Sequence, residues 1–239
     1  MKNFKLTIEY DGTDYHGWQI QPDKKTVQGS LYRAFHEFAG EDVKITGAGR
    51  TDAGVHAVGQ VASVRLETKH SPTILRKALT GNLPRDILVR HVEEVPLSFS
   101  ARFDATSRSY NYIFITRKTA LWRRYYHYVK TDLDREAMRT ALATLRGEKD
   151  FASFASSSDI KSTRCRMMKA ELMENGPLLT ISLTADHFLY NMVRTIAGVI
   201  LDVGMGKPID MDELIEARDR RAAGKTMPPN ALYLMSVTY

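Results

Sequence analysis

The sequence has very little cysteine and lacks a long apolar run. Its only cysteine, Cys165, has no partner for an intrachain disulfide, which fits a reducing compartment such as the cytoplasm. No stretch of about 18 apolar residues occurs, so we expect no transmembrane helix. The N-terminal residues 1–5 lead into an alternating pattern and not into the apolar core of a signal peptide. We therefore expect a cytoplasmic protein without a membrane span.

Several common catalytic motifs are also missing. The sequence has no Gly-Lys-Ser/Thr of a P-loop and no G-x-S-x-G of a serine hydrolase. The seven histidines are scattered, with no HExxH motif, and the single cysteine offers no Cys pair. A protein metal site is therefore not expected. We expect Cys165 to be a half-buried strand residue, because it alternates with Met167.

The composition is ordinary for a globular protein but carries a basic excess. Hydrophobic residues make up 43% of the 239 residues, which is enough for a core, and the length allows two domains of roughly 100 to 120 residues. Lys and Arg total 34 against 28 Asp and Glu, giving a formal charge of +6. This excess favours a polyanionic partner such as a nucleic acid.

The first hundred residues predict the element order β-α-β-β-α-β. Alternation predicts strands near residues 4–10, 43–45, 62–66 and 87–95, and helical spacing predicts helices near residues 27–38 and 72–79. Gly40 and Gly81 are typical helix ends. Ser71 and Pro72 are a typical N-cap and first-turn proline.

The second half repeats this order. We expect strands over residues 109–116, 165–172, 179–185 and 232–239, and helices over residues 134–146 and 187–203. Asn175-Gly176-Pro177 predicts the turn of a hairpin. Asp210 and Glu213 resemble a capping box that begins one more helix.

Two halves with one element order predict a mixed α/β (α+β) protein. Each half is expected to form a ferredoxin-like, RRM-like β-α-β-β-α-β lobe, with a central cleft between the lobes. We expect an N-terminal lobe at residues 1–100 and a C-terminal lobe at residues 101–239, joined near residues 96–108.

The most informative segment is the glycine-rich stretch from Gly47 to Ala57. It lies between two expected strands, and its glycines permit unusual backbone angles and close approach of a partner. Arg50, Thr51 and Asp52 supply a guanidinium, a hydroxyl and a carboxylate. Asp52 is therefore a candidate catalytic group, and the alternative is that Asp52 only caps a turn.

This loop resembles a known family. Gly49-Arg50-Thr51-Asp52-Ala53-Gly54-Val55-His56-Ala57 is similar to the signature loop of the TruA family of tRNA pseudouridine synthases. Other blocks resemble the family in the same order along the whole chain. They are Tyr10-Asp11-Gly12-Thr13 with Tyr15 and Gly17-Trp18-Gln19, Phe99-Ser100-Ala101-Arg102-Phe103-Asp104-Ala105, Arg108-Ser109-Tyr110-Asn111-Tyr112, and Asp186-His187-Phe188-Leu189-Tyr190-Asn191-Met192-Val193-Arg194. The resemblance implies a pseudouridine synthase fold.

One block departs from the family pattern. The family's C-terminal block runs Ala-Pro-Pro-x-Gly-Leu, whereas this chain has Met227-Pro228-Pro229-Asn230-Ala231-Leu232. Alanine restricts the backbone where the family has glycine, which leaves the shape of that pocket wall open.

The resemblance implies isomerisation of uridine to pseudouridine in tRNA, with no cofactor, on a nucleotide flipped out of its stack. It implies that Asp52 attacks either the uracil ring or the ribose anomeric carbon. Arg194 would keep Asp52 charged, and its neighbours predict that it lies beside a buried helix face. Tyr110 would stack on the uracil, although by alternation Tyr110 or Tyr112 can be a core residue instead. Leu232 would pack on the other side of the base.

RNA contacts are expected from basic and aromatic side chains. Arg50 and His56 of the signature loop are candidates, and Arg50 can enter the space of the flipped nucleotide. Candidate phosphate contacts are Arg102, Arg108, Arg123, Arg124, Arg220, Arg221 and Lys225. Trp122 and residues 125–128 can stack on nucleotides or only pack a loop. Residues 10–21 can bind RNA or shape the cleft wall.

Family resemblance also implies a target in the tRNA anticodon stem-loop, at the nucleotides conventionally numbered 38, 39 and 40, and a homodimer in which one tRNA touches both subunits. Three other functions remain open on sequence grounds. The chain can be a passive RNA-binding protein, a pseudouridine synthase for other RNA positions, or a metal-dependent nuclease, although the carboxylate clusters that a nuclease needs are not visible.

Overall fold

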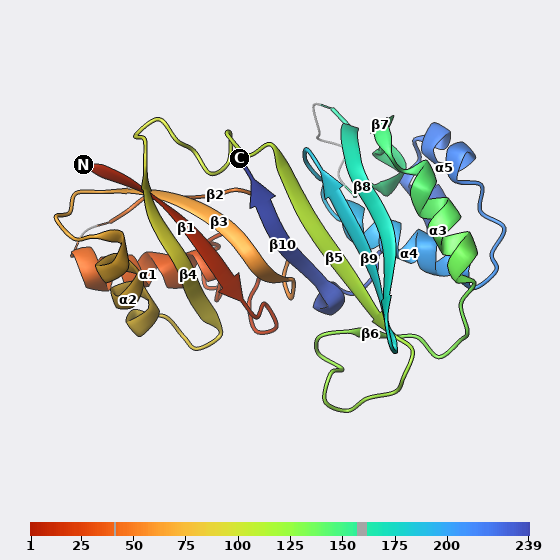
Figure 1. The fold of residues 1–239 in the computed structure, drawn as a ribbon, viewed down its shortest axis with the longest axis horizontal. Coiled ribbons are helices and arrows are strands. Elements are labelled where there is room, and N and C mark those ends of the chain that lie inside the picture. Colours follow the sequence, from red (N-terminus) through yellow and green to blue (C-terminus); the bar gives the residue numbers. More distant parts are fainter. Residues whose placement is uncertain (41, 157–161) are drawn as a thin grey trace. The chain divides into compact units, whose positions relative to one another are not determined.

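The computed structural model describes residues 1–40, 42–156 and 162–239, which form two units (Figure 1). The first unit comprises Met1–Thr106 together with Tyr233–Tyr239, and the second comprises Ser107–Leu232. The expected boundary lay at residue 100, and the C-terminal strand was expected in the second lobe. Its grouping with the first unit follows from strand pairing that is far from local in the sequence.

The first unit has the ferredoxin-like order that the sequence predicts. Its elements are β1 (Lys2–Tyr10), α1 (Val27–Ala39), β2 (Ile45–Gly47), β3 (His56–Leu66), α2 (Pro72–Asn82) and β4 (Ile87–Val95). The strands pair in the order β4-β1-β3-β2, all antiparallel. The terminal strand β10 (Leu232–Thr238) runs parallel to the start of β3, with Tyr233 opposite His56 and Leu234 opposite Ala57.

Local sequence signals explain these elements. Phe4, Leu6 and Ile8 alternate along β1, and all three are fully buried. Thr26 caps α1 by accepting a hydrogen bond from the Gly29 N–H, and Gly40 ends that helix in the left-handed conformation at φ 68°. The predicted elements of this unit are therefore confirmed, but the expected stop at Gly81 was wrong, because α2 continues through Gly81 to Asn82.

The second unit contains more short elements than the sequence predicts. They are β5 (Ser107–Ile115), β6 (His127–Tyr128), α3 (Arg135–Thr144), β7 (Gly147–Asp150), η1 (Ala152–Phe154), β8 (Arg164–Asn175), β9 (Leu178–Ala185), α4 (Met192–Gly204), α5 (Met211–Ala217), η2 (Arg220–Ala223) and η3 (Pro229–Ala231). Within this unit the antiparallel strand order is β5-β9-β8-β7, and β6 pairs with β5. Cys165 lies on β8 and is buried rather than half-buried. The mixed α/β class is confirmed.

One helix begins later than expected. The prediction placed its start at His187, but α4 begins at Met192. Asn191 has φ 63°, in the left-handed region, and a right-handed helix does not continue through such a residue. His187 instead follows a turn in which Asp186 Oδ1 accepts the N–H groups of Arg166 and His187. The predicted helix start was wrong because periodicity does not register this backbone reversal.

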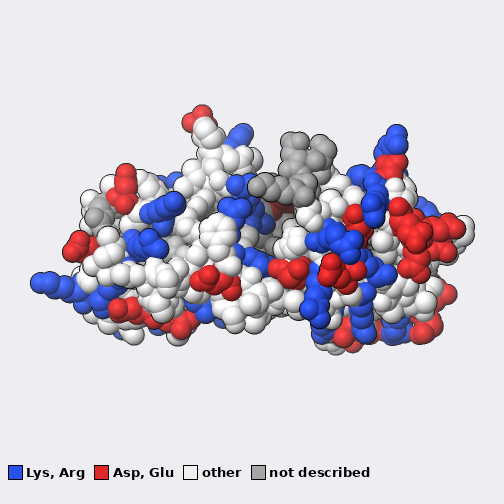
Figure 2. Space-filling view, turned by 90° about the horizontal axis from the view of Figure 1, so that it is seen from above, with Lys and Arg blue, Asp and Glu red and all other residues white. Residues whose placement is uncertain are grey.

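The face in Figure 2 carries Lys and Arg side chains interspersed with Asp and Glu. The net charge of +6 therefore does not locate a binding surface on this face. In the described part of the chain, none of the helices has both the length and the apolar character needed to span a membrane.

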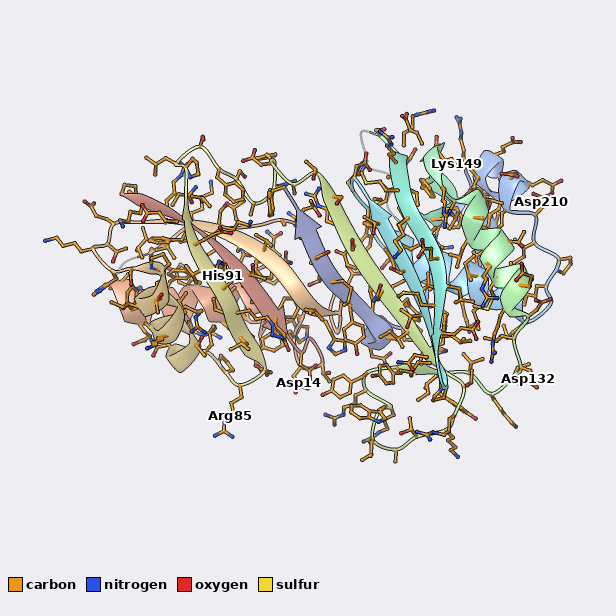
Figure 3. The ribbon with its side chains drawn as sticks, in the orientation of Figure 1. Asp14, Arg85, His91, Asp132, Lys149 and Asp210 are labelled. Atoms are coloured by element: carbon orange, nitrogen blue, oxygen red, sulfur yellow. The ribbon has the colours of Figure 1, made fainter. Side chains whose placement is uncertain are left out.

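The N-cap of α3 provides a test of these local assignments. Asp134 accepts a hydrogen bond of 2.9 Å from the Ala137 N–H. We predict that Asp134→Ala lowers the free energy of unfolding by about 1 kcal/mol, because one helix-end N–H loses its partner. Asp132→Ala is the matched control, since Asp132 is exposed at the surface (Figure 3). Urea unfolding followed by circular dichroism measures both, and equal midpoints for the two variants would contradict the capping role.

Candidate active site

The glycine-rich loop between β2 and β3 holds Asp52 in a defined position. Asp52 is half-buried, and its carbonyl oxygen accepts the Val55 N–H at 3.2 Å, which closes a tight turn. Gly54 in this turn has φ 77°, which a residue with a side chain rarely adopts. Arg50, two residues before Asp52, is exposed. The loop therefore combines a fixed backbone with an accessible guanidinium.

Residues 10–18 bond to this loop on both sides of Asp52. The Trp18 N–H donates to the Thr51 carbonyl at 3.0 Å, and the Gly54 N–H donates to the Tyr15 carbonyl at 3.2 Å. The Tyr10 hydroxyl lies 2.7 Å from Thr51 Oγ1 in a buried hydrogen bond. Burial raises the pKa of Tyr10, so this phenol stays neutral.

Two glycines make this approach possible. A Cβ on Gly12 would lie 2.0 Å from the Val55 carbonyl oxygen, and one on Gly17 would lie 2.6 Å from the Thr51 carbonyl oxygen. Gly17 also has φ 86°. Sequence reasoning left open whether residues 10–21 bind RNA or shape a wall, and it did not single out these two glycines. The structure brings Gly12 and Gly17 against the Asp52 loop.

His56 lies just after the loop and is 2% exposed. Its Nδ1 accepts the Gly12 N–H at 3.1 Å, and its ring stacks on Tyr233 with centroids 4.8 Å apart. Gln60 adds a partly buried bond, from its Nε2 to the Gly49 carbonyl at 3.0 Å. These contacts connect the loop to β1, β3 and β10 within the first unit.

In the second unit, β5 presents two tyrosines with different environments. Tyr110 is 9% exposed and meets Phe188 edge to face, with centroids 5.2 Å apart. Tyr112 is fully buried, and its hydroxyl donates to the Pro228 carbonyl at 3.0 Å. Burial raises the pKa of Tyr112. Both tyrosines are buried, and Tyr112 is the more completely enclosed of the two.

Arg194 lies on the first turn of α4 and is half-buried. Its Nε donates to the Met227 carbonyl at 2.6 Å, and its Nη1 donates to Asn191 Oδ1 at 2.8 Å. Asn191 is the left-handed residue before the helix. The residue that reverses the backbone therefore also accepts a hydrogen bond from the Arg194 guanidinium. A guanidinium bonded in this way has a fixed orientation, unlike an arginine that extends freely into water.

Leu232 follows the short helix η3 and is 5% exposed. Among the described residues, the non-glycine residues with positive φ are Asp23, Asn191 and Arg218. Ala231 therefore has an ordinary backbone conformation and is fully buried. The alanine that departs from the family pattern fits the backbone of this chain without strain.

The remaining basic candidates differ in how they are bonded. Arg102 is exposed in the first unit. Arg108, in the second unit, donates to the Asp186 carbonyl at 2.8 Å. Arg220 donates to the Gly224 carbonyl and to Thr226 Oγ1, both at 2.7 Å. Arg221 forms a two-pronged bond with the Asp219 carboxylate.

One group of side chains in the second unit has atoms of the kind that bind metals. Cys165, Asp186 and His187 each offer one such atom within 4.8 Å of the others. Sequence reasoning missed this group because Cys165 is far from the other two along the chain. Burial raises the pKa of Cys165 to about 12, and Asp186 Oδ1 already lies 3.0 Å from His187 Nδ1. Hydrogen bonds within the protein account for this geometry.

The fold and the Asp52 loop describe a mixed α/β protein with a carboxylate on a rigid glycine-rich turn, and comparison with known proteins identifies its family. A family model of tRNA pseudouridine synthases matches residues 6–104 and 141–239. The tRNA pseudouridine synthases A of Caldicellulosiruptor bescii and Caldicellulosiruptor saccharolyticus are each 46% identical over 244 residues and align over 100% of both chains. That of a Geobacillus species is 44% identical over 100% of this chain and 98% of its own.

This chain belongs to the tRNA pseudouridine synthase family, whose members are enzymes that isomerise uridine to pseudouridine in tRNA. A solved archaeal box H/ACA sRNP Nop10-Cbf5 complex shares 11% identity over 95% of this chain and 58% of that chain, with a TM-score of 0.37. A likeness this weak has no bearing on the fold.

The close approach at Gly12 is testable. We predict that Gly12→Ala lowers the free energy of unfolding by about 2 kcal/mol or more, because its Cβ would overlap the Val55 carbonyl. Gly49→Ala is the control in the same region, since a Cβ there meets nothing within 4 Å. Thermal and urea unfolding measure the difference. A Gly12→Ala variant as stable as Gly49→Ala would show that the approach does not constrain the loop.

Proposed function

We propose that this chain converts uridine to pseudouridine in tRNA and that Asp52 is its catalytic carboxylate. The observation that supports this most is the Asp52 loop. A half-buried carboxylate stands on a turn whose neighbours Thr51 and Gly54 are each bonded to residues 15–18. A carboxylate held this way loses little freedom when it meets a substrate, which favours chemistry at a fixed point.

The reaction breaks one bond at the ribose anomeric carbon and forms another bond at the same carbon. The bond between the ribose anomeric carbon and uracil N1 breaks, the base turns, and a bond from the anomeric carbon to uracil C5 forms. The C5 proton is lost and N1 gains a proton, so atoms balance without a cofactor. Asp52 would add to the uracil ring or to the anomeric carbon, and both routes need an ionised carboxylate.

We further propose that Arg194, Tyr110 and Leu232 complete this site. The guanidinium of Arg194 would hold Asp52 in its charged form. Its orientation by Met227 and Asn191 supports this role. Tyr110 would stack on the flipped base and exchange a proton through its hydroxyl, and its low exposure against Phe188 supports a fixed ring. Leu232 would cover the other face of the base.

RNA contacts follow from accessibility. Arg50 and Arg102 are exposed, and we propose that they contact the flipped nucleotide and its phosphates, with Arg108 as a further contact. His56 is buried against Gly12 and Tyr233, so we propose that it supports the loop from inside the protein. Arg221 is paired with the Asp219 carboxylate, which makes it a poorer phosphate contact.

The finer points of the proposal rest on the family resemblance. We propose that the target lies in the anticodon stem-loop, at nucleotides 38, 39 and 40, and that a homodimer in the cytoplasm binds the tRNA. The alternatives are separable by simple measurements. A passive RNA-binding protein would bind tRNA without forming pseudouridine, and a metal-dependent nuclease would lose activity with a chelator.

The role of Asp52 is tested by Asp52→Asn. We predict a loss of pseudouridine formation on the order of 10⁴-fold or more, with tRNA binding retained, because the amide has a similar shape but no nucleophilic charge. The measurement is release of tritium from tRNA that carries uridine labelled at C5. Asp14→Asn is the control, since Asp14 is an exposed carboxylate in the segment that supports the loop. Tritium release by Asp52→Asn at the normal rate would remove Asp52 from the mechanism.

The two tyrosines of β5 give a matched pair. We predict that Tyr110→Phe slows isomerisation about 10²-fold while tRNA binding persists, because the ring remains and the proton-exchanging hydroxyl is lost. Tyr112→Phe should instead lower stability by about 1 kcal/mol without slowing the reaction, because only the bond to Pro228 is lost. Single-turnover rates and urea unfolding separate the two effects. Equal rates for both variants would exclude proton exchange by Tyr110.

A further inference from the structure

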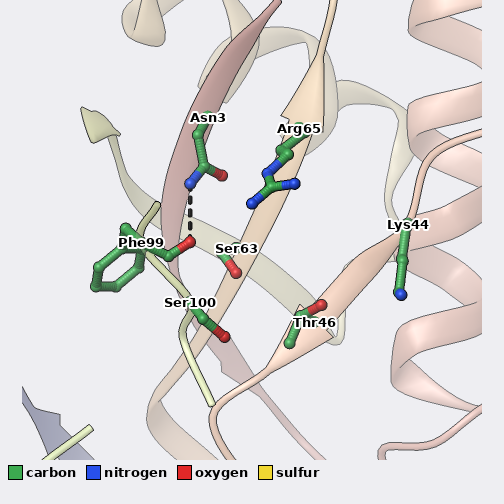
Figure 4. Close-up of a pocket in the computed structure, with 7 residues that line it drawn as sticks. All are labelled: Asn3, Lys44, Thr46, Ser63, Arg65, Phe99 and Ser100. Carbon is green, nitrogen blue, oxygen red and sulfur yellow. Dashed lines mark hydrogen bonds between the residues drawn. The ribbon is translucent and has the colours of Figure 1, made fainter. Parts of the chain in front are cut away.

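A hollow on the open face of the first unit's sheet is lined by polar and basic side chains (Figure 4). It has a volume of about 170 Å³ and is lined by Asn3, Lys44, Thr46, Ser63, Arg65, Phe99 and Ser100. All of these residues belong to the first unit. None of them was a candidate on sequence grounds, and none takes part in the site described above.

Strand register explains why these side chains share one face. Asn3 on β1 pairs with Arg65 on β3, and Ser63 on β3 pairs with Thr46 on β2. Residues two apart on a strand point to the same side, so Arg65 and Ser63 share a face. Their neighbours Phe4 and Val64 point to the opposite side and are buried in the core.

Hydrogen bonds within the protein hold the wall of the hollow in place. Asn3 Nδ2 donates to the carbonyls of Pro96 and Phe99, each at 2.9 Å. Arg65 Nη2 donates to the Leu97 carbonyl at 2.8 Å. Three bonds therefore hold residues 96–99 against the strands and keep the guanidinium of Arg65 at the rim.

The hollow also holds hydrogen-bond donors. Ser63 Oγ accepts the Ala101 N–H at 3.1 Å, which leaves its O–H to act as a donor. Thr46 and Ser100 place two more hydroxyls around the opening (Figure 4). The described residues that line the hollow include no carboxylate.

The cations of the hollow differ from their neighbours on the same sheet. Lys5 pairs with Glu93 at 3.1 Å, and Arg90 pairs with Glu9 at 2.6 Å. Within residues 1–40, 42–156 and 162–239, neither Lys44 nor Arg65 forms an ion pair with a carboxylate. Two cations beside hydroxyl donors and without a carboxylate form a setting suited to an oxyanion.

We propose that this hollow binds a backbone phosphate of the RNA substrate. The identity of the ligand rests on the proposed function, because tRNA is the polyanion that this chain would handle. Position supports the choice, since β2, which carries Thr46, leads directly into the Asp52 loop and β3 leads out of it. A phosphate held by Lys44 and Arg65 fixes the register of the RNA with respect to that loop.

Binding of an unmodified tRNA transcript at several salt concentrations tests this inference. The variant Lys44→Ala/Arg65→Ala is expected to lose roughly tenfold in affinity, and the slope of log affinity against log salt should become shallower by about 0.7 to 0.9 for one lost phosphate. Arg76→Ala/Lys77→Ala on α2 removes the same charge elsewhere, at positions where alanine suits a helix. This control should change affinity by less than about twofold and leave the slope unchanged.

Further variants distinguish a loss of phosphate binding from a loss of folding. Lys44→Arg/Arg65→Lys retains both charges and should restore most of the affinity. Thr46→Val keeps shape and charge, and should weaken binding without changing the salt slope. If the alanine pair matches the Arg76/Lys77 control, the proposal is overturned. A second result would also overturn the proposal. If millimolar inorganic phosphate binds the hollow but the variants do not change the affinity for tRNA, the site binds a free anion and not the RNA backbone.

The outcome is separable from that of the proposed function. Affinity that depends on the hollow, without tritium release by the unaltered protein, would refute the enzymatic proposal and support the phosphate site. Tritium release by the unaltered protein, together with a tRNA affinity that substitutions at Lys44 and Arg65 leave unchanged, would support the enzymatic proposal and refute the phosphate site.

Discussion

The carbonyl oxygens of Thr51 and Val55 approach the backbone of Gly17 and Gly12 so closely that no side chain fits between them. This main-chain approach acts together with the bond from the Val55 N–H to the Asp52 carbonyl to fix the turn on which Asp52 stands. Hydrogen bonds from Trp18 and to Tyr15 then hold the turn from outside. A short loop would otherwise sample many conformations, and a carboxylate on it would have no defined position.

The same constraint links the loop to distant parts of the chain. His56 accepts the Gly12 N–H and stacks on Tyr233, near the C-terminus. A small cluster of Ala48, Val61 and Ala101 is covered by Phe99, Val237 and Tyr239. The C-terminal strand therefore contributes to the surroundings of a loop almost two hundred residues earlier. This explains why β10 groups with the first unit although it follows the second in sequence.

Periodicity predicts elements whose pattern is local. The strand β1 and the helix α1 follow from alternation, from helical spacing and from the caps Thr26 and Gly40. The start of α4 does not follow, because its determinant is one left-handed asparagine. The four-residue strand β7 is also invisible, since its edge pairing with β8 leaves no apolar pattern in Gly147–Asp150. The motif located the glycine-rich loop, whereas the close approach of Gly12 and Gly17 to that loop is visible only in the structure.

The formal charge does not show which side chains can attract a polyanion. The hydrogen bonds and ion pairs of each cation show this better. Arg194 donates to the Met227 carbonyl and Arg220 donates to the Gly224 carbonyl, so both side chains help to order the chain around them. Lys5 and Arg90 are offset by carboxylates, which limits their attraction for a polyanion. Lys44 is exposed immediately before β2, and Arg50 is exposed in the Asp52 loop that follows β2. An RNA backbone that follows this segment would meet positive charge close to Asp52, so the position of these two cations matters more than the net charge of +6.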